Sequence, residues 1–166
     1  MKNDLVDYVT RVNEDPAQVP RAAWNALLQG EREPSPFMRH EYLCALHDSG
    51  SANRKTGWIP AFHTLWQGDE LVAACALYLK SHSYGEYVFD WAWANAYEQH
   101  GLAYYPKALV AVPFTPVPGA RLLARDAGAR AALVRSVIDW AGERELSSVH
   151  LLFLSEDDQA ACGPQG

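Results

Sequence analysis

The chain of 166 residues predicts a mixed α/β fold, with a mostly antiparallel central sheet flanked by helices. Two observations support this fold class. Residues 71–79 are apolar on both alternating faces, which is typical of a strand covered by helices on both sides. Helical and strand-like patterns also follow one another in the order strand, helix, helix, strand, strand, helix, strand, helix, strand.

The first third of the chain is expected to form one strand and two helices. Asp15 followed by Pro16, and Ser35 followed by Pro36, each match a capping residue with proline at the first helical position. β-formers precede the first of these signals, and apolar residues with helical spacing follow both. The predicted elements are a strand at 5–12 and helices at 15–30 and 35–48.

The middle of the chain predicts a hairpin and a short helix. The turn residues 67–70 separate two β-rich stretches, and the second is the doubly apolar run. A helix is expected to end near His100, because Gly101 can take the left-handed conformation that closes helices. The predicted elements are strands at 58–66 and 71–80 and a helix at 91–100.

The last third predicts a strand, the most regular helix and a final buried strand. Asp126 is the expected cap of that helix, whose apolar stripe includes Leu133 and Val137. We expect a single domain over residues 1–154 and a polar tail rich in glycine and proline at 155–166. The predicted elements are a strand at 104–114, a helix from 126 and a strand at 148–154.

The composition excludes several classes of protein. A formal charge of −6 and a pI near 5.4 argue against a nucleic-acid or anionic-membrane surface. Asp4 and Asp7 interrupt any signal peptide, and 71–79 is too short to span a bilayer. The cysteines at 44, 75 and 162 lie far apart and form no CxxC pair, so a reducing, cytoplasmic location is expected.

Several catalytic motifs are absent or incomplete. His40 and Glu41 begin an HExxH-like pattern, but Cys44 stands where the second histidine would be, so no metal site is expected. The chain also lacks the G-x-S-x-G elbow of serine hydrolases, the P-loop and the dinucleotide fingerprint.

The stretch 80–93 is the strongest candidate for a site. It follows the apolar strand and holds a histidine, two carboxylates, two tyrosines and two tryptophans. Loops at the ends of rigid strands often carry ligand-binding and catalytic groups. The alternative is that the two tryptophans and Phe89 belong to the core and the acids face water.

Four stretches resemble a bacterial family of Fem-like proteins in the acyl-CoA N-acyltransferase (GNAT) superfamily, often labelled peptidoglycan biosynthesis or recognition proteins. The resemblance runs from about residue 16 to residue 154, and it implies a GNAT-like fold. The stretches are PFMRHEYL at 36–43, LKSHSYGEYVFDWAW at 79–93, YYPK at 104–107 and VAVPFTPVPGARLL at 110–123.

The resemblance also implies a longer protein. Family members look considerably longer, with a second GNAT-like half, so this chain is expected to be the N-terminal half, with the truncation point in the tail at 155–166. Fem-like proteins place their site between or across two halves. The expected partners include the missing C-terminal half or a second copy, because an apolar edge at 148–154 invites self-association.

The first functional hypothesis is an N-acyltransferase or aminoacyltransferase, or half of one. The acceptor would be a small-molecule or peptide amine, and acetyl-CoA or another acyl-CoA would be the donor. We expect Glu86 as base, Asp90 as the alternative base, Tyr84 as proton donor and His82 as the group that orients either acid. The expected substrate-binding residues are Trp91, Trp93, Tyr105, Thr115, Gly119 and Arg121.

A pattern at 125–130 bears on the donor. Coenzyme A acetyltransferases cradle the pyrophosphate on a Gln/Arg-x-x-Gly-x-Gly/Ala loop at a helix start, and here Arg130 takes the last position. The alternative is an ordinary helix cap by Asp126.

The second functional hypothesis is non-catalytic. A half-domain could bind a peptide, a cell-wall precursor or a partner chain through an aromatic surface of Trp91, Trp93, Tyr104 and Tyr105. A third reading makes the whole stretch 80–93 part of the folding scaffold.

Overall fold

The computed structural model describes residues 7–163 and contains eight strands and five α-helices within them. The strands are β1 (Val9–Asn13), β2 (Trp58–Pro60), β3 (Phe62–Gln67), β4 (Glu70–Cys75), β5 (Leu77–Lys80), β6 (Lys107–Val110), β7 (Leu122–Ala124) and β8 (Val149–Leu151). The helices are α1 (Arg21–Gly30), α2 (His40–Asp48), α3 (Trp91–Gln99), α4 (Ala127–Glu143) and α5 (Glu156–Ala161). Residues 5 and 6 of the predicted first strand lie outside the described range.

The strands form two four-stranded sheets, in the orders β1-β3-β4-β7 and β2-β5-β6-β8. All neighbours are antiparallel except β6 and β8, so the predicted mixed, mostly antiparallel fold class is confirmed. Both strands of the predicted hairpin change sheet, one at Ala61 and the other at Ala76. The amide of Ala61 donates to the carbonyl of Leu77 at 2.8 Å, which keeps the two strands bonded across the change.

β6 and β7 pair with the two halves of the strand that bends at Ala76: β6 with β5, and β7 with β4. Val110 at the end of β6 lies opposite Leu77, and Leu122 at the start of β7 lies opposite Cys75. The chain therefore leaves the sheet at the bend, forms the loop 111–121 and returns to the same edge. The predicted strand at 104–114 is consequently shorter than expected, and β7 was not predicted.

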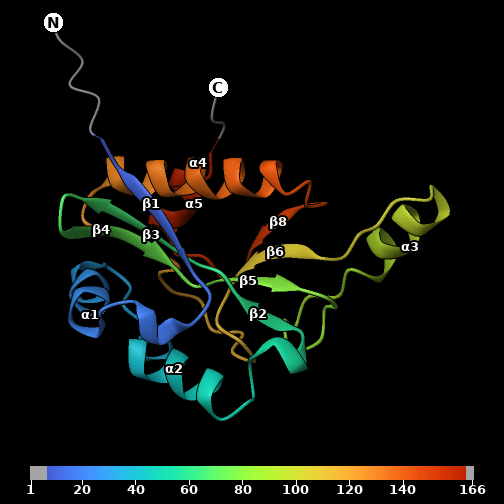
Figure 1. Cartoon of the computed structure of the whole chain (residues 1–166), viewed down its shortest axis with the longest axis horizontal. Helices are drawn as coiled ribbons and strands as arrows, with labels where there is room; N and C mark the ends of the chain where they lie inside the picture. Colours follow the sequence, from blue (N-terminus) through green and yellow to red (C-terminus); the bar gives the residue numbers. More distant parts are fainter. Residues whose placement is uncertain (1–6, 164–166) are drawn as a thin grey trace, which may run out of the picture.

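Helices cover both faces of the sheets. In Figure 1, α4 and α5 lie on one side, and α1 and α2 lie on the other. The buried apolar residues form two hydrophobic cores, one on each side of the sheets. Ala74 and Tyr78 lie in the core on the α1 side, and Cys75 and Leu77 lie in the core on the α4 side. This arrangement accounts for the doubly apolar pattern at 71–79. α3 stands apart from both layers, and none of its residues is buried by the described chain.

Two of the predicted helices start later than expected. Asp15 and Ser35 cap short 3-10 turns at Pro16–Gln18 and Pro36–Met38, and the α-helices begin at Arg21 and His40. Val19 is extended because it precedes Pro20, and this ends the first turn. The predicted cap at Asp126 is confirmed, since its Oδ1 accepts from the amide of Ala129 at 2.8 Å.

The end of the described chain is folded. The last strand, β8, is half-buried rather than buried, and α5 follows it within the segment predicted as a tail. Asp158 of α5 is fully buried, where it accepts from the amides of Arg121 at 2.7 Å and Leu122 at 3.3 Å.

The same edge of β7 receives two more side chains. Glu31 accepts from the amide of Ala124 at 2.8 Å, and Arg130 donates to the carbonyl of Leu122 at 3.1 Å. Arg130 also pairs with Glu31 at 2.5 Å. Side chains from the residue after α1, from α4 and from α5 thus take the place that a neighbouring strand would occupy beside β7.

Candidate functional site

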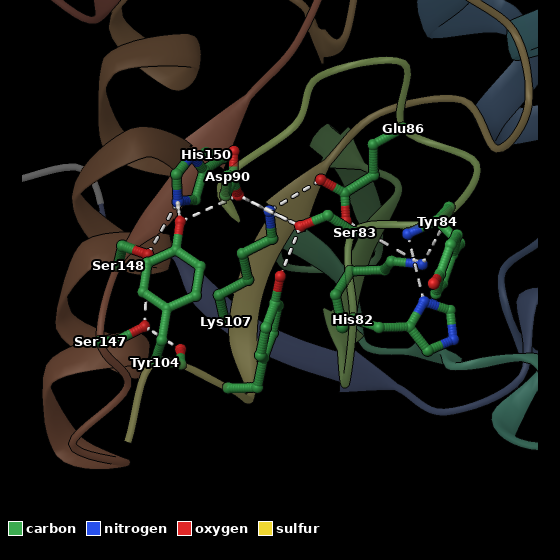
Figure 2. A network of polar contacts seen from close by, with 12 residues as sticks. His82, Ser83, Tyr84, Glu86, Asp90, Tyr104, Lys107, Ser147, Ser148 and His150 are labelled. Carbon is green, nitrogen blue, oxygen red and sulfur yellow. Dashed lines mark hydrogen bonds and ion pairs between the residues drawn. The ribbon is translucent and has the colours of Figure 1, made fainter. Parts of the chain in front are cut away.

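Two predicted acids converge on one buried lysine. Glu86 and Asp90 lie in the loop after β5, and Lys107 is the first residue of β6 (Figure 2). The Nζ atom of Lys107 donates to Glu86 Oε2 at 2.7 Å and to Asp90 Oδ2. All three residues are at most 5% exposed. Burial raises the pKa of Glu86, although Lys107 opposes this change.

Ser83 joins the group from the start of the same loop. Its Oγ donates to Asp90 at 3.3 Å, accepts from Lys107 at 3.1 Å and lies 2.7 Å from the hydroxyl of Tyr105. Tyr105, which was predicted to bind substrate, therefore contacts the acids through Ser83.

A second buried lysine lies on the other side of Glu86. Lys80 donates to the carbonyl of Tyr84 at 3.1 Å, and its Nζ is 3.6 Å from the ring centre of Trp58. The same Nζ is 4.0 Å from Glu86 Oε1, which has no hydrogen-bond partner within residues 7–163. Burial lowers the pKa of Lys80 to about 8. The cluster thus contains two lysines and two carboxylates, so its formal charges balance.

A polar chain leads from Asp90 toward the surface. The hydroxyl of Tyr104 donates to Asp90 Oδ2 at 2.9 Å and lies 3.2 Å from His150 Nε2, which is 2.8 Å from Ser148 Oγ. Burial alone would raise the pKa of Asp90, but the bonds from Lys107 and Tyr104 outweigh burial and lower it. Burial and the Asp90 charge both raise the pKa of Tyr104, so its hydroxyl stays protonated.

This chain opens into a pocket of about 220 Å³. The pocket is lined by Trp93, Tyr97, Tyr104, Ser148 and His150. Tyr97 holds α3 against the body, because its ring packs on Tyr104 at 5.2 Å between centres and its hydroxyl donates to the carbonyl of Ser147 at 3.4 Å.

The aromatic part of the loop 80–93 is exposed. Tyr84 is 64%, Phe89 67%, Trp91 52% and Trp93 65% exposed. The rings of Phe89 and Trp91 stack at 6.4 Å, and Tyr84 contacts Trp91 edge-on at 6.0 Å. The alternative that placed these rings in the core is therefore wrong, and so is its placement of the acids in water.

His82 and Tyr84 lie beside each other on the Lys80 side of the cluster (Figure 2). The amide of Tyr84 donates to His82 Nδ1 at 3.2 Å. No hydrogen bond joins either side chain to Glu86 or Asp90 in the described structure, so their predicted roles toward these acids stay predictions.

The loop 111–121 contains three predicted substrate-binding residues, and all three bond to the backbone of the protein itself. Thr115 donates to the carbonyl of Pro113 at 2.9 Å, and the amide of Gly119 donates to the carbonyl of Phe153 at 3.1 Å. Arg121 is 1% exposed and donates to the carbonyls of Val117 and Gly119. Arg121 thus holds its own loop together, and its expected role in substrate binding stays a prediction.

The start of α4 does not fit a pyrophosphate. The Asp126 carboxylate already caps its amides, Arg125 pairs with that carboxylate at 3.2 Å, and Arg130 points inward to Glu31. A phosphate would meet the negative charge of Asp126 there. Of the two readings of 125–130, the structure has the ordinary helix cap.

Sequence reasoning missed both lysines, Ser83 and His150. A signal was present for the lysines. Lys107 directly precedes the apolar stretch 108–112, and Lys80 is the last residue of the predicted strand 71–80. A lysine within a strand that is buried on both faces requires a buried partner. Nothing in the sequence links His150 to Asp90, because Tyr104 makes that link in space.

Comparison with known proteins gives the class of the chain. The model of the FemAB-like family, described as peptidoglycan biosynthesis/recognition, matches residues 15–166. The chain therefore belongs to the FemAB-like family. No curated protein matches it, and no solved structure does. Within residues 7–163, every helix is too short or too polar to span a bilayer.

Proposed function

We propose that the chain takes part in acyl or aminoacyl transfer to an amine of a peptidoglycan precursor. The family supports peptidoglycan biosynthesis or recognition in general. One observation supports transfer in particular. Glu86 and Asp90 share Lys107 in a buried site, and Tyr104, which donates to Asp90, lines a pocket.

The proposed chemistry needs a base for the amine proton and donors for the carbonyl oxygen. Glu86 is the proposed base, directly or through a water, because its Oε1 is free to accept a proton. Burial raises its pKa and so strengthens it as a base. Asp90 is the alternative, and it reaches the pocket through Tyr104.

The donor is proposed to be an acyl-CoA or another activated acyl compound. The capped start of α4 gives no support to a pyrophosphate site there, so no step of the mechanism relies on it. The test is thermal unfolding of the chain with and without acetyl-CoA. A ligand that binds only the folded state raises the midpoint, whereas an unchanged midpoint excludes acetyl-CoA as donor for this chain.

The transfer itself is tested by Glu86→Gln and Asp90→Asn. Each change keeps the shape of the side chain and removes its charge. We expect the variant of the true base to lose transfer to a lysine-containing stem peptide by at least about 100-fold. Glu98→Gln, an exposed change on α3, is the matched control. Full transfer by both variants, with unfolding midpoints near that of the parent, would overturn the assignment of the base to these two residues.

Recognition without catalysis is the second candidate. The exposed rings of Phe89, Trp91 and Trp93 support it, because large aromatic residues often anchor interfaces. A partner chain or a second copy could also pair along β8, an edge strand. Tight binding of the stem peptide, with no transfer from any acyl donor, would favour this candidate.

A further inference from the structure

The pocket beside α3 brings an imidazole and the side chains of three aromatic residues together. His150 comes from β8, Tyr104 from the segment before β6, and Trp93 and Tyr97 from α3. None of the five lining residues is a carboxylate, a lysine or an arginine. The nearest charges act through Tyr104, where Asp90 and Lys107 lie behind its hydroxyl (Figure 2).

Asp90, acting through Tyr104, favours one tautomer of His150. The single hydroxyl proton of Tyr104 is donated to Asp90, so the Tyr104 oxygen can only accept a bond from His150. A hydrogen on His150 Nε2, at 3.2 Å, satisfies this oxygen, and Ser148 Oγ is then a second acceptor at 2.8 Å. The other nitrogen, Nδ1, is then unprotonated, and no hydrogen bond is made to it within the described chain.

The imidazole is also neutral near pH 7. Burial and the positive charge of Lys107 lower the pKa of His150 below the ordinary 6.5, and the Asp90 carboxylate opposes them. A neutral imidazole with a free Nδ1, held by a carboxylate through a hydroxyl, has the properties of a general base.

We propose that this pocket receives the amine of the acceptor and that His150 is the base that deprotonates it. This inference rests on the proposed transfer function, and it replaces Glu86 with His150 as the group that touches the reacting nitrogen. Asp90 and Tyr104 are then positioning residues, because they act through His150. The aliphatic part of the amine packs between the rings of Trp93 and Tyr97.

The step balances with an activated acyl ester or thioester as co-reactant. The lone pair of the neutral amine forms a bond to the acyl carbon. The bond from that carbon to the leaving oxygen or sulfur breaks, and its electron pair goes to the leaving group. The amine proton moves to His150 Nδ1, which afterwards returns it to the leaving group or to solvent.

The first test needs no acyl donor. In ¹⁵N-labelled protein, the His150 resonances should report an Nε2–H imidazole, and Tyr104→Phe should change the balance of the two tautomers. A lysine-containing stem peptide should shift the Nδ1 resonance, and the same peptide acetylated on its ε-amine should not. An Nδ1–H imidazole, or equal shifts from both peptides, would overturn the inference.

The second test measures transfer. His150→Gln should lower transfer by at least about 100-fold. Protonation of the ε-amine lowers the rate of both proteins as the pH decreases. The wild-type rate should fall further once the pH is below 6.5, the ordinary histidine value, and this additional fall should be absent from the residual activity of the variant. Tyr104→Phe should lower transfer less and move the decline. His100→Gln, at the exposed end of α3, is the matched control.

The two tests separate the inference from the function. If the amine shifts the His150 resonance but no donor gives transfer, the amine-binding site is supported and the proposed transfer is overturned. If His150→Gln leaves the transfer rate unchanged, the inference about His150 is overturned, but the proposed transfer function stands.

Discussion

Lys107 and Glu86 form an ion pair of 2.7 Å in which each side chain is 1% exposed. Because Lys107 also binds Asp90, one ammonium group serves two carboxylates. Removal of Lys107 would leave the two buried carboxylates with one lysine, Lys80, at 4.0 Å from Glu86, and a desolvated charge without a matching partner is costly.

We therefore expect Lys107→Met to lower the free energy of unfolding by about 3–5 kcal/mol. Without Lys107, both carboxyls should bind protons more readily in the folded state, so the deficit should shrink as the pH falls toward 4. Urea unfolding at several pH values measures this. Lys55→Met, at an exposed lysine, is the control, and equal effects of the two changes would contradict the account.

A second prediction concerns His63, a buried residue whose Nδ1–H donates to the carbonyl of Ala61 at 2.9 Å. Its ring meets Trp140 edge-on, and Arg144 is a nearby positive charge. Burial lowers its pKa from 6.5 to about 4. The unfolded chain then binds more protons between these values, so stability falls as the pH drops from 6.5 to 4.

The expected loss from His63 over that interval is about 3 kcal/mol, since each pH unit is worth up to about 1.4 kcal/mol. His63→Gln should remove this share of the acid sensitivity, whatever its effect near neutral pH. The check is the difference in unfolding free energy between the two pH values in both proteins. Equal differences would show that His63 does not carry the effect.

A comparison of two glycines separates the energetic cost of side-chain crowding from the cost of backbone strain. Gly57 and Gly68 both have a positive φ, of 77° and 60°. A Cβ atom at Gly57 would lie 2.3 Å from His82 Nε2, whereas one at Gly68 would meet nothing within 4 Å. We expect Gly68→Ala to cost about 1 kcal/mol and Gly57→Ala clearly more, because His82 must move. Thermal unfolding compares them, and equal costs would contradict this prediction.

The carboxylate of Asp158 is predicted to be essential to the edge of β7. Asp158→Asn replaces one acceptor oxygen with a donor that faces the amides of Arg121 or Leu122, so we expect a loss of about 2 kcal/mol or more. Asp157→Asn, at a neighbouring residue whose carboxylate pairs with Arg32 at 3.3 Å, removes the same charge as a control. Denaturant midpoints measure both. A similar midpoint for the two variants would count against the prediction.

Much of the fold could be predicted because its signals are local. The doubly apolar pattern at 71–79 and the cap at Asp126 act through neighbouring residues, and both predictions are confirmed. The change of sheet at Ala61 and Ala76 and the position of β7 depend on distant pairings. The late start of α1 could have been predicted, since Pro20 constrains Val19.

The site could be predicted only in part. Glu86 and Asp90 stood out as acids in an aromatic loop, and both are in the cluster. His82 and Tyr84 stood out equally, yet they lie on the Lys80 side without a bond to either acid in the described structure. Adjacency in sequence does not reveal which way a side chain points, and the contact of Lys107 with the acids spans about twenty residues.

The side chains that close the edge of β7 also impose an order on folding during synthesis. Glu31 leaves the ribosome before most of the strands, but Asp158 leaves it only after all eight described strands have been made. Until then, the amides of Arg121 and Leu122 lack their acceptors, and a nascent chain exposes this edge to other strands. The edge of the sheet that contains β7 is thus closed only after α5 has been made.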